Sequence, residues 1–479
     1  MTIETKQTTQ SGDELARINR IFIQQQQAYA QEPMPALEER KQHLKTLKTL
    51  LLQHQDEIAQ AINGDFTARS TNETLLAEIM PCVSHIDYVL SRLGRWMKPS
   101  SRSVGIAFQP ARARVVYQPL GVVGIMVPFN YPLGLGVEPL ITALAAGNRA
   151  MLKMSELTPG FAGLLGEILL KGFDEDRVAV ITGEVDVAKA FSELPFDHLL
   201  FTGSIPVGKH VMRAAAENLT PVTLELGGKS PVIIADDIPL DDIIDRIVFA
   251  KAINGGQTCV APDYILIPRA KMQAFLEAFK TTFKQMYPVV NGNPDYTSVI
   301  NQKSYQRLQD WLLDAAQKGA HIEKVSEETI DDGTYRMVPH LVTEVTDAMK
   351  IMQEELFGPI LPVLPYDSLD EALSFVASRP RPLALYLFTY DRALQERAMN
   401  QTHAGSMAIN EALLQVGIDD MPFGGIGPSG MGQYHGHEGF LTMSKAKSVL
   451  IKQRFNSMKF MYPPYGRPIQ QWILRFLIR

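Results

Sequence analysis

Cysteine is scarce in this chain, which has only Cys82 and Cys259 among its 479 residues. Two cysteines cannot build a disulfide framework or a four-cysteine zinc site. Positive charge is not in excess either, because 46 Lys and Arg stand against 52 Asp and Glu, a net charge of −6. A general nucleic-acid-binding protein is typically basic, so we expect no nucleic-acid partner.

Long apolar runs are missing as well. No stretch approaches the roughly 20 apolar residues that a membrane-spanning helix requires. Residues 1–14 are polar and lack the basic-then-apolar order of a signal peptide. Hydrophobic residues make up 46% of the chain and charged residues 20%, which indicates a globular protein of two or three domains. We therefore expect a cytoplasmic protein.

The hydrophobic pattern changes along the chain. Leucines at 44, 47 and 51 recur at helical spacing, and the first 95 residues are predicted to be mostly helical. From residue 114 to 228, short apolar, β-branched segments alternate with helical ones, and the same alternation covers residues 230–410. Such alternation is typical of βαβ units and parallel sheets. The strands expected in the first of these regions are 121–127, 150–153, 178–181, 198–201 and 220–224.

Cys259 is a candidate nucleophile. It ends the segment Asn254-Gly-Gly-Gln-Thr-Cys259, whose small residues would let a ligand approach the backbone closely. A cysteine thiol is strongly nucleophilic even when only a few per cent is ionised at pH 7. On spacing alone, however, a buried structural role is the commoner one for a lone cysteine. For Cys82, in an apolar helical stretch, we expect only the structural role.

Two further polar residues lie where strands are predicted to end. Glu225 stands between two leucines, and apolar flanks would raise its pKa toward that of a general base. The alternative is a carboxylate capped by the amides of the following glycines. Asn130 is held between two prolines, and its amide could donate to an oxyanion or merely satisfy a turn. The segment 201–208 joins a strand to a helix, where backbone amides can face an anion.

Together these residues resemble the aldehyde dehydrogenase superfamily. The start near the first core helix is similar to the class 3 branch, and residues 108–112, 195–204 and 259–264 look most like its coniferyl aldehyde dehydrogenases. One motif would be weak evidence, whereas seven in family order make chance negligible. The motifs are Pro128-Phe-Asn-Tyr-Pro132, Leu152-Lys-Met-Ser-Glu156, Phe201-Thr-Gly-Ser204, Glu225-Leu-Gly-Gly-Lys-Ser-Pro231, Gly256-Gln-Thr-Cys259, Glu354-Glu-Leu-Phe-Gly-Pro359 and Pro422-Phe-Gly-Gly425.

The resemblance implies an α/β fold with two parallel-sheet domains and a small β element for oligomerisation. It implies the following domains: a Rossmann-like NAD-binding domain of residues 1–98 and 122–226, a catalytic domain of 227–418, an oligomerisation or bridging element of 99–121 and 419–452, and a basic tail of 453–479. A homodimer is the implied assembly. For the tail we expect packing across the dimer interface or fraying in solvent, with contact to a membrane surface as the less favoured alternative.

The resemblance also implies catalytic roles. Cys259 would attack the aldehyde carbon, and the Asn130 amide and the Cys259 backbone N–H would hold the resulting oxyanion. Hydride transfer would leave a thioester, which a water activated by Glu225 would hydrolyse. No metal is expected, because His435 and His437 have no third ligand at useful spacing.

The implied cofactor is NAD. A carboxylate at Glu156 favours a free 2′-hydroxyl over a 2′-phosphate, so NADP is the alternative. Ile205, where a threonine is common, and Phe129, in place of the usual tryptophan, depart from the family pattern. The implied cofactor residues are Lys153 and Glu156 at the adenosine ribose, Gly203 and Ser204 near the pyrophosphate, and Glu355 and Phe357 at the nicotinamide ribose.

The implied activity is NAD-dependent oxidation of an aldehyde to its acid, with coniferyl or a related aromatic aldehyde favoured as substrate. A medium- or long-chain aliphatic aldehyde is the nearest alternative. A CoA-acylating enzyme, in which CoA rather than water takes the acyl group, is more remote, since a water-activating Glu225 would hydrolyse the thioester first. A non-catalytic cofactor-binding protein is equally remote, because Cys259, Glu225 and Asn130 are all present.

Overall fold

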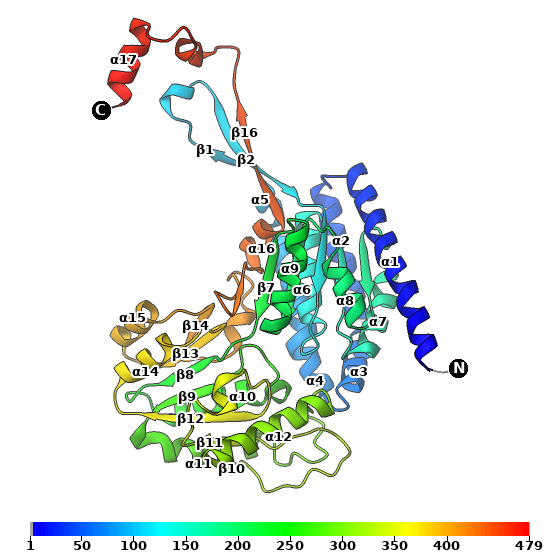
Figure 1. Ribbon diagram of the computed structural model, residues 1–479, viewed down its shortest axis with the longest axis vertical. Coiled ribbons are helices and arrows are strands. Elements are labelled where there is room, and N and C mark those ends of the chain that lie inside the picture. The colour runs from blue at the N-terminus through cyan, green and yellow to red at the C-terminus, as the bar shows by residue number, and fades with distance from the viewer. Residues whose placement is uncertain (1–2, 479) are drawn as a thin grey trace.

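Three β-sheets organise the chain in the computed structural model, which describes residues 3–478 (Figure 1). A six-stranded and a seven-stranded sheet each form the centre of a domain with helices around it. A three-stranded sheet forms an arm that extends away from both domains (Figure 1). The prediction of two α/β domains with a small β element is confirmed.

The first domain is built on the sheet β15-β7-β6-β3-β4-β5, whose strands are parallel except for β15. The central strands are short, β-branched and buried on both faces, as a sheet covered by helices requires. The strands are β3 (Val122–Met126), β4 (Arg149–Lys153), β5 (Val178–Ile181), β6 (His198–Gly203), β7 (Val222–Leu226) and β15 (Gly430–Met431).

Helices cover this sheet, and residues 3–96 are mostly helical, as predicted for the first 95 residues of the chain. Helix α6 is buried on almost every side, and it packs against α2 and α5. The helices are α1 (Ile3–Gln31), α2 (Leu37–Gln53), α3 (Gln55–Asp65), α4 (Thr71–Thr74), the π-helical turn η1 (Leu75–Ile79), α5 (Met80–Trp96), α6 (Gly134–Ala146), α7 (Pro159–Leu170), α8 (Val185–Ser192) and α9 (Ile205–Glu217).

The glycine-rich segment near residue 430 adds an edge strand to this domain. It falls within the range 419–452 that the resemblance assigns to the oligomerisation or bridging element, yet β15 pairs antiparallel with β7, Gly430 opposite Glu225. Gly430 has φ +144°, and a Cβ there would lie 2.1 Å from the carbonyl oxygen of Leu224. Only glycine allows the two strands to approach this closely.

The second domain is built on the sheet β10-β11-β12-β9-β8-β13-β14, in which only β10 runs antiparallel to its neighbour. Its strands are β8 (Pro231–Ile234), β9 (Tyr264–Pro268), β10 (His321–Lys324), β11 (His340–Thr343), β12 (Ile360–Tyr366), β13 (Ala384–Phe388) and β14 (Ser406–Ile409). Its helices are α10 (Ile244–Ala252), α11 (Met272–Met286), α12 (Gln302–Gln317), α13 (Lys350–Gln353), α14 (Leu369–Ala377) and α15 (Arg392–Gln401), with 3₁₀ turns η3 (Leu240–Asp242), η4 (Ile253–Gly256), η5 (Arg269–Lys271) and η6 (Leu414–Gly417).

The arm is an antiparallel sheet of β1 (Ser100–Arg102), β2 (Arg112–Pro119) and β16 (Ser444–Ile451). Helix α16 (Gly436–Thr442) leads from the first domain into β16. Two 3₁₀ turns, η2 (Ile106–Phe108) and η7 (Ser457–Met461), and the terminal helix α17 (Pro468–Leu477) lie at the far end of the arm (Figure 1). Nearly all of β16 is exposed.

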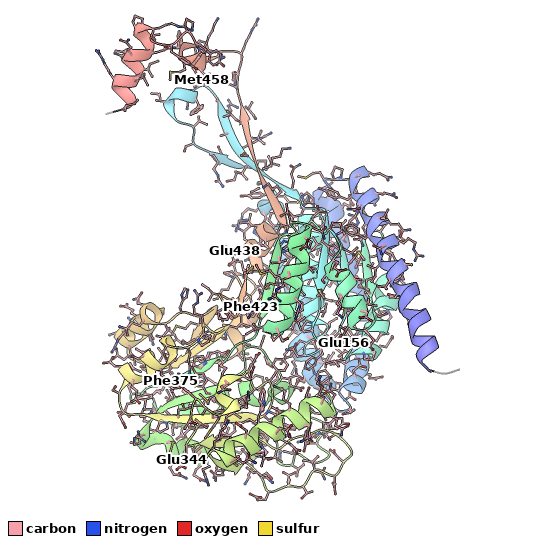
Figure 2. The ribbon with its side chains drawn as sticks, in the orientation of Figure 1. Glu156, Glu344, Phe375, Phe423, Glu438 and Met458 are labelled. Atoms are coloured by element: carbon pink, nitrogen blue, oxygen red, sulfur yellow. The ribbon has the colours of Figure 1, made fainter. Side chains whose placement is uncertain are left out.

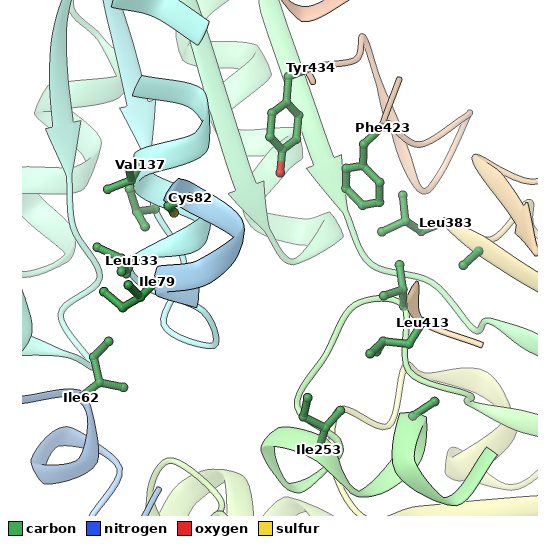
Figure 3. Close-up of a cluster of buried hydrophobic side chains, with 14 of the residues drawn as sticks. Ile62, Ile79, Cys82, Leu133, Val137, Ile253, Leu383, Leu413, Phe423 and Tyr434 are labelled. Atoms are coloured by element: carbon green, nitrogen blue, oxygen red, sulfur yellow. The ribbon is translucent and has the colours of Figure 1, made fainter. Parts of the chain in front are cut away.

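One large cluster of buried side chains spans both domains (Figure 3). Leu133 and Val137 contribute to it from the first domain, and Ile253 and Leu413 from the second. Cys82 is fully buried in this cluster, which confirms its predicted structural role. The junction between the domains is therefore a packed surface, and the candidate catalytic residues lie along it.

Candidate active site

Cys259 lies in a tightly coiled loop between η4 and β9. Asn254, Gly255 and Gly256 immediately before it have φ values of 51°, 59° and 77°, three consecutive residues in the left-handed region. A Cβ at Gly256 would lie 2.6 Å from the carbonyl oxygen of Gly358, so this glycine is required by a close backbone contact. Such local strain persists only where the surroundings hold it in place, and it is typical of functional loops.

The structure brings Asn130 against this loop. The Asn130 Nδ2 donates to the carbonyl oxygen of Gln257 at 3.1 Å. In return, the Asn254 Nδ2 donates to the carbonyl oxygens of Asn130 at 2.8 Å and of Gln257 at 3.2 Å. Asn130 is buried, and one of its two amide hydrogens is used in this contact. The second hydrogen can serve a ligand bound beside Cys259.

Burial controls the ionisation of Cys259 and Glu225. Burial, with smaller contributions from the Glu355 and Glu225 carboxyls, raises the pKa of the Cys259 thiol to about 12, and the N–H groups of Cys259 and Val260 oppose this rise. Burial also raises the pKa of Glu225 well above its ordinary value. Glu225 is 2% exposed, and neither of its carboxyl oxygens has a hydrogen-bond partner. A buried carboxyl without a partner is the type of group that enzymes use as a base near neutral pH.

Glu355 is the third acid of this region. Burial is the main cause that raises its pKa to about 8, with Asp263 adding to the effect and the Gly228 N–H opposing it. Its Oε1 is buried without a partner. A Cβ at Gly227 would lie 1.8 Å from the Glu355 Oε2, so the glycine pair of the motif leaves room for this carboxyl.

Phe357 stands two residues further on, with φ +49°. A left-handed conformation is unfavourable for a large side chain and marks a constrained position. Its ring packs edge-on against Phe129, which precedes Asn130, with 5.7 Å between the ring centroids. The phenylalanine that replaces the usual tryptophan thus packs across the junction between the domains.

The residues expected near the adenosine half of a dinucleotide lie on the first domain. Lys153 ends β4, is buried, and donates from Nζ to the Met154 carbonyl oxygen at 2.7 Å. Burial lowers its pKa, and Glu156 is the strongest of the nearby acids that oppose this. Glu156 itself is exposed in the turn after β4 (Figure 2). Its carboxylate is therefore open to a ligand.

The turn between β6 and α9 offers free backbone donors. Ser204 is the N-cap residue of α9, but its side chain caps no backbone amide, and the first turn contains no acidic residue. The open N-terminus of a 13-residue helix favours an anion such as a pyrophosphate. A dinucleotide therefore fits this chain: the α9 terminus suits its phosphates, and the partnerless Glu355 oxygen suits a ribose hydroxyl.

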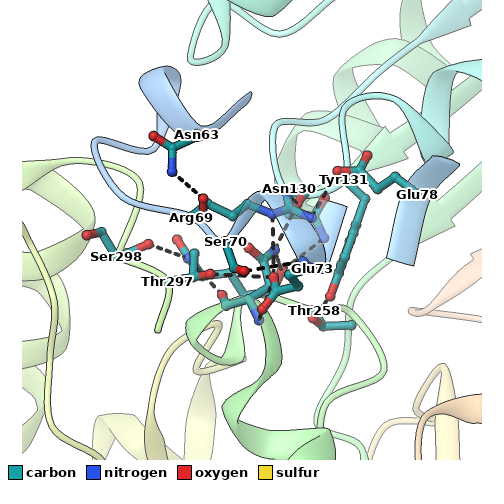
Figure 4. Close-up of polar contacts among 12 residues, drawn as sticks. Asn63, Arg69, Ser70, Glu73, Glu78, Asn130, Tyr131, Thr258, Thr297 and Ser298 are labelled. Atoms are coloured by element: carbon teal, nitrogen blue, oxygen red, sulfur yellow. Dashed lines mark hydrogen bonds and ion pairs between the residues drawn. The ribbon is translucent and has the colours of Figure 1, made fainter. Parts of the chain in front are cut away.

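Sequence reasoning missed a buried ionic cluster that underlies the site: Arg69, Glu73 and Glu78 (Figure 4). Arg69 is fully buried and donates to the Asn130 carbonyl oxygen at 3.0 Å. Its guanidinium lies 2.9 Å from the Glu78 Oε1 and 3.4 Å from the Glu73 Oε1. Burial raises the pKa values of both acids, and the charge of Arg69 opposes this.

The two acids of this cluster tie down both loops of the site. Glu78 accepts from the N–H groups of Leu133 and Gly134, at the start of α6, at 2.8 and 3.0 Å. Glu73 accepts from the Asn254 N–H at 3.1 Å. The i, i+4 spacing of Arg69 and Glu73 would equally describe an exposed helix pair. Their burial follows from the docking of the second domain, which spacing along the chain does not reveal.

Other residues that hold the site were also missed. The Tyr386 hydroxyl donates to the Val260 carbonyl oxygen at 2.5 Å and fixes the residue after Cys259. Arg307 donates to the Leu356 carbonyl oxygen at 3.1 Å, beside Glu355. Tyr386 and Arg307 each hold the backbone in or next to one of the sequence motifs, but neither residue is part of a motif.

Comparison with known proteins places this site in a family. The model of the aldehyde dehydrogenase family matches residues 7–449. The chain belongs to this family. Among its relatives is a probable coniferyl aldehyde dehydrogenase of Pseudomonas aeruginosa, 54% identical over 98% of this chain and 98% of the relative. Aldehyde dehydrogenase family 3 member A2 of Mus musculus is 36% identical over 96% of this chain and 94% of the relative. The predicted resemblance is confirmed.

Solved structures of other aldehyde dehydrogenases have the same fold. The substrate-bound state of Staphylococcus aureus AldH covers 96% of this chain and 99% of its own, with 37% identity and a TM-score of 0.90. The Mycobacterium tuberculosis aldehyde dehydrogenase complexed with NAD+ covers 92% of this chain and 91% of its own, with 28% identity and a TM-score of 0.84. Within residues 3–478, no three His, Cys, Asp or Glu side chains group as metal ligands.

Proposed function

We propose that this aldehyde dehydrogenase oxidises coniferyl aldehyde, or a related aromatic aldehyde, to the carboxylic acid with NAD. The observation that carries the proposal is the contact of the Cys259 loop with Asn130, next to the partnerless carboxyl of Glu225. The substrate class is supported by the name and the 54% identity of the Pseudomonas aeruginosa relative. The cofactor is supported by the NAD+ complex of the similar Mycobacterium tuberculosis structure.

The chain's own residues account for the acyl chemistry. The Cys259 thiol gives its proton to a water, the thiolate sulfur attacks the aldehyde carbon, and the carbonyl oxygen gains negative charge that the Asn130 Nδ2 and the Cys259 N–H stabilise. One such donor contributes about 2.7–4 kcal/mol to the stabilisation of the transition state. Loss of a hydride from that carbon would leave the thioester. Bound NAD supplies the hydride acceptor. Glu225 then takes a proton from water as the water oxygen attacks the thioester carbon, and the sulfur leaves with the acid as product.

The cofactor residues would divide between the domains. Lys153, Glu156 and the 203–204 turn would hold the adenosine half from residues 1–98 and 122–226, the proposed NAD-binding domain. Glu355 and Phe357 would hold the nicotinamide ribose from residues 227–418, the proposed catalytic domain. The exposed carboxylate of Glu156 favours NAD over NADP because it would repel a 2′-phosphate.

Residues 99–121 and 419–452 are the proposed oligomerisation element, which includes the arm strands β1, β2 and β16, and a homodimer is the proposed assembly. Strand β16 is a sheet edge with most of its residues exposed, and an unpaired edge of this kind is a template for pairing with another chain. Sizing of the purified protein by light scattering tests this. A monomer or a tetramer would contradict it.

The test of function is NADH formation with coniferyl aldehyde and with a long aliphatic aldehyde, wild type beside Cys259→Ala. We expect the higher kcat/KM with the aromatic aldehyde and no activity in Cys259→Ala. A preference for the aliphatic aldehyde would leave the mechanism intact and refute the substrate class. Absence of NADH from the wild-type protein with every aldehyde would refute the function.

A further inference from the structure

Helix α6 has one face that is not fully buried. Within this helix only Leu135 and Glu138 are half-buried, and every other residue is buried. The Leu135 N–H donates to the Tyr131 carbonyl oxygen at 2.9 Å, so the turn that begins at Tyr131 continues into the helix. Tyr131 is also half-buried, and the spacing of these three residues places them on one side of the helix. This face therefore begins directly after the catalytic Asn130 and extends to Glu138.

Tyr131 places the beginning of this face beside the nucleophile. Its hydroxyl forms a hydrogen bond with the Thr258 Oγ1 at 2.8 Å, and Thr258 directly precedes Cys259. A helical rise of 1.5 Å per residue puts Glu138 about 10 Å beyond Tyr131 along the helix. This distance is close to the span from the aldehyde carbon to the para oxygen of a hydroxylated cinnamaldehyde. Such a molecule, with its aldehyde at Cys259, would reach Glu138 with its far end.

Glu138 forms a carboxyl–imidazole pair with His435 that the proposed mechanism does not use. The Glu138 Oε2 lies 2.8 Å from the His435 Nε2, and the two side chains are 15% and 6% exposed. Within the described residues, the other carboxyl oxygen of Glu138 has no hydrogen-bond partner. His435 has φ +78°, a left-handed conformation that is unfavourable for a residue with a side chain. The surroundings therefore hold His435 in place, and His435 in turn fixes the Glu138 carboxyl.

A second pair of the same kind lies next to the first. The His85 Nδ1, on α5, lies 2.9 Å from the Asp419 Oδ1, and the rings of His85 and His435 are 5.5 Å apart. The His85 Nε2 is buried and has no hydrogen-bond partner. Unpaired polar atoms in a buried region cost stability, and they are tolerated where water or a ligand supplies the partner. The two pairs thus form a polar cluster that is incomplete without a further group.

Tyr434 lies close both to this cluster and to the catalytic residues. Its ring contacts the His435 ring edge-on, with 4.4 Å between the centroids. Burial is the main cause that raises the pKa of Tyr434 well above its ordinary value, and Glu138, Glu225 and Cys259 all add to the effect. The antiparallel pairing of β15 with β7 brings this segment beside the catalytic carboxyl. The Glu138–His435 pair is therefore near the place where the aldehyde reacts.

Aromatic rings surround the space between the pair and the catalytic residues. The Phe423 ring stacks on the His435 ring at 5.7 Å and meets the Tyr434 ring edge-on at 5.8 Å. Figure 3 shows Phe423 and Tyr434 on the side of the junction opposite Cys82 and Val137. Stacked and edge-on contacts favour an aromatic ligand over an aliphatic one of similar size.

We propose that the Glu138–His435 pair recognises a hydroxyl group on the aromatic ring of the substrate, at the end opposite the aldehyde. This inference rests on the proposed oxidation of an aromatic aldehyde, and it names the group that the site selects. The ring hydroxyl donates to the free oxygen of the Glu138 carboxyl, and His435 holds that carboxyl in position. An aliphatic chain in the same place would leave Glu138 facing apolar atoms, so the pair also disfavours aliphatic aldehydes.

Initial rates with 4-hydroxycinnamaldehyde and cinnamaldehyde, which differ only in this hydroxyl, test the proposal at pH 7. We expect the wild-type kcat/KM to be higher for the hydroxylated aldehyde by about tenfold or more, the usual effect of a hydrogen bond to a charged group. Glu138→Leu should lose this preference through a higher KM for 4-hydroxycinnamaldehyde, and it should keep its kcat/KM for cinnamaldehyde. Glu138→Gln keeps an acceptor oxygen and should retain part of the preference.

The matched control is Glu57→Leu on α3, which removes the carboxyl of another carboxyl–imidazole pair. The Glu57 Oε1 lies 3.2 Å from the His54 Nδ1, and this variant should keep the wild-type ratio of the two kcat/KM values. The ratio within one variant does not depend on how much of the protein is folded, so partial unfolding cannot imitate the expected result.

Equal kcat/KM values for the two aldehydes in the wild type would overturn the inference and leave the proposed function intact. The same holds if Glu138→Leu keeps the preference for the hydroxylated aldehyde. A fall of both values by one common factor in Glu138→Leu and in Glu138→Gln would assign Glu138 a structural role instead. Absence of NADH from the wild type with both aldehydes would refute the proposed function and this inference with it.

Discussion

The buried Arg69 allows a quantitative test of how the two loops of the active site are held. Replacing it with methionine keeps much of the side-chain volume and removes the charge. Glu78 is then left fully buried, and Glu73 nearly so, without the cation that faces both carboxylates. Removing one partner of a buried ion pair typically costs 3–5 kcal/mol, because the other charge remains uncompensated. We expect a loss of this size in the free energy of unfolding at pH 8.

The loss should depend on pH, and the sign follows from the two acids. Burial already raises the pKa values of Glu73 and Glu78, and removing Arg69 raises them further. The folded variant then takes up protons that the unfolded chain releases above about pH 4.5, so its stability falls as pH rises. Denaturant unfolding at pH 5 and pH 8 should therefore show the smaller deficit at pH 5.

Measurement of kcat in the Arg69 variants distinguishes a role in positioning the active-site loops from a role in stability alone. Arg69 donates to the Asn130 carbonyl oxygen, and Glu73 accepts from the Asn254 N–H, so both loops lose an anchor. A displacement of about 1 Å at a reacting group can cost 10²-fold, and we expect kcat to fall by that order with the KM for NAD nearly unchanged. Arg69→Lys keeps the charge and should recover part of kcat.

A matched control is Arg269→Met, which removes an exposed arginine paired with an exposed Asp367. Exposed pairs contribute about 0–1 kcal/mol, so this variant should stay close to wild type in stability and in kcat. The reasoning is refuted if Arg69→Met keeps kcat within threefold and unfolds at the wild-type denaturant concentration. It is also refuted if the stability deficit is the same at both pH values.

Three further variants test other parts of the site. Glu355→Gln should raise the KM for NAD by about tenfold or more at pH 9, with a smaller effect on kcat, since Glu355, with a pKa of about 8, is then ionised and a hydrogen bond to a charged group is worth about 1.5–3 kcal/mol; initial-rate assays with varied NAD measure this. Glu225→Gln should lower kcat by about 10²–10⁴-fold while leaving a first-turnover burst of NADH, because the base acts after hydride transfer. The same variant should melt at a higher temperature than wild type at pH 8, with the difference shrinking toward pH 4.5, because burial raises the folded pKa of Glu225 and makes its ionised form costly. Gly430→Ala should cost about 1–3 kcal/mol and detach β15, because the added Cβ meets the Leu224 carbonyl oxygen at a left-handed φ; thermal unfolding and proteolysis near residue 430 measure this.

The sequence predicted the elements whose pattern is local. The strand expected at 178–181 is β5, and the strand expected at 150–153 is β4, which begins one residue earlier. Short apolar, β-branched runs suit only a strand that is buried on both faces, so their positions could be read directly. Strand β15 could not, because it has two residues and exists only through its pairing with a strand about 200 residues away.

The candidate site divides in the same way. Cys259, Glu225 and Asn130 each lie within a short family motif, so the resemblance could identify them from the residues on either side. Arg69 and Tyr386 act on those motifs from distant segments through backbone carbonyls. Every residue has a backbone carbonyl, so the type of the accepting residue does not predict such a hydrogen bond. Its existence follows only from the folded arrangement.

The buried acids of the junction show which part of the site is structural and which is open to ligands. Glu73 and Glu78 have Arg69 and backbone N–H groups as partners, and they hold loops. Glu225 and Glu355 are buried as well, yet three of their four carboxyl oxygens have neither a hydrogen bond nor an ion pair, whereas the Glu78 Oε1, which also lacks a hydrogen bond, lies 2.9 Å from the Arg69 guanidinium. Leaving such groups unpaired costs stability, and folds tolerate that cost where water, substrate or cofactor supplies the partner. The distribution of partners therefore separates the acids that maintain the geometry from those that meet the reactants.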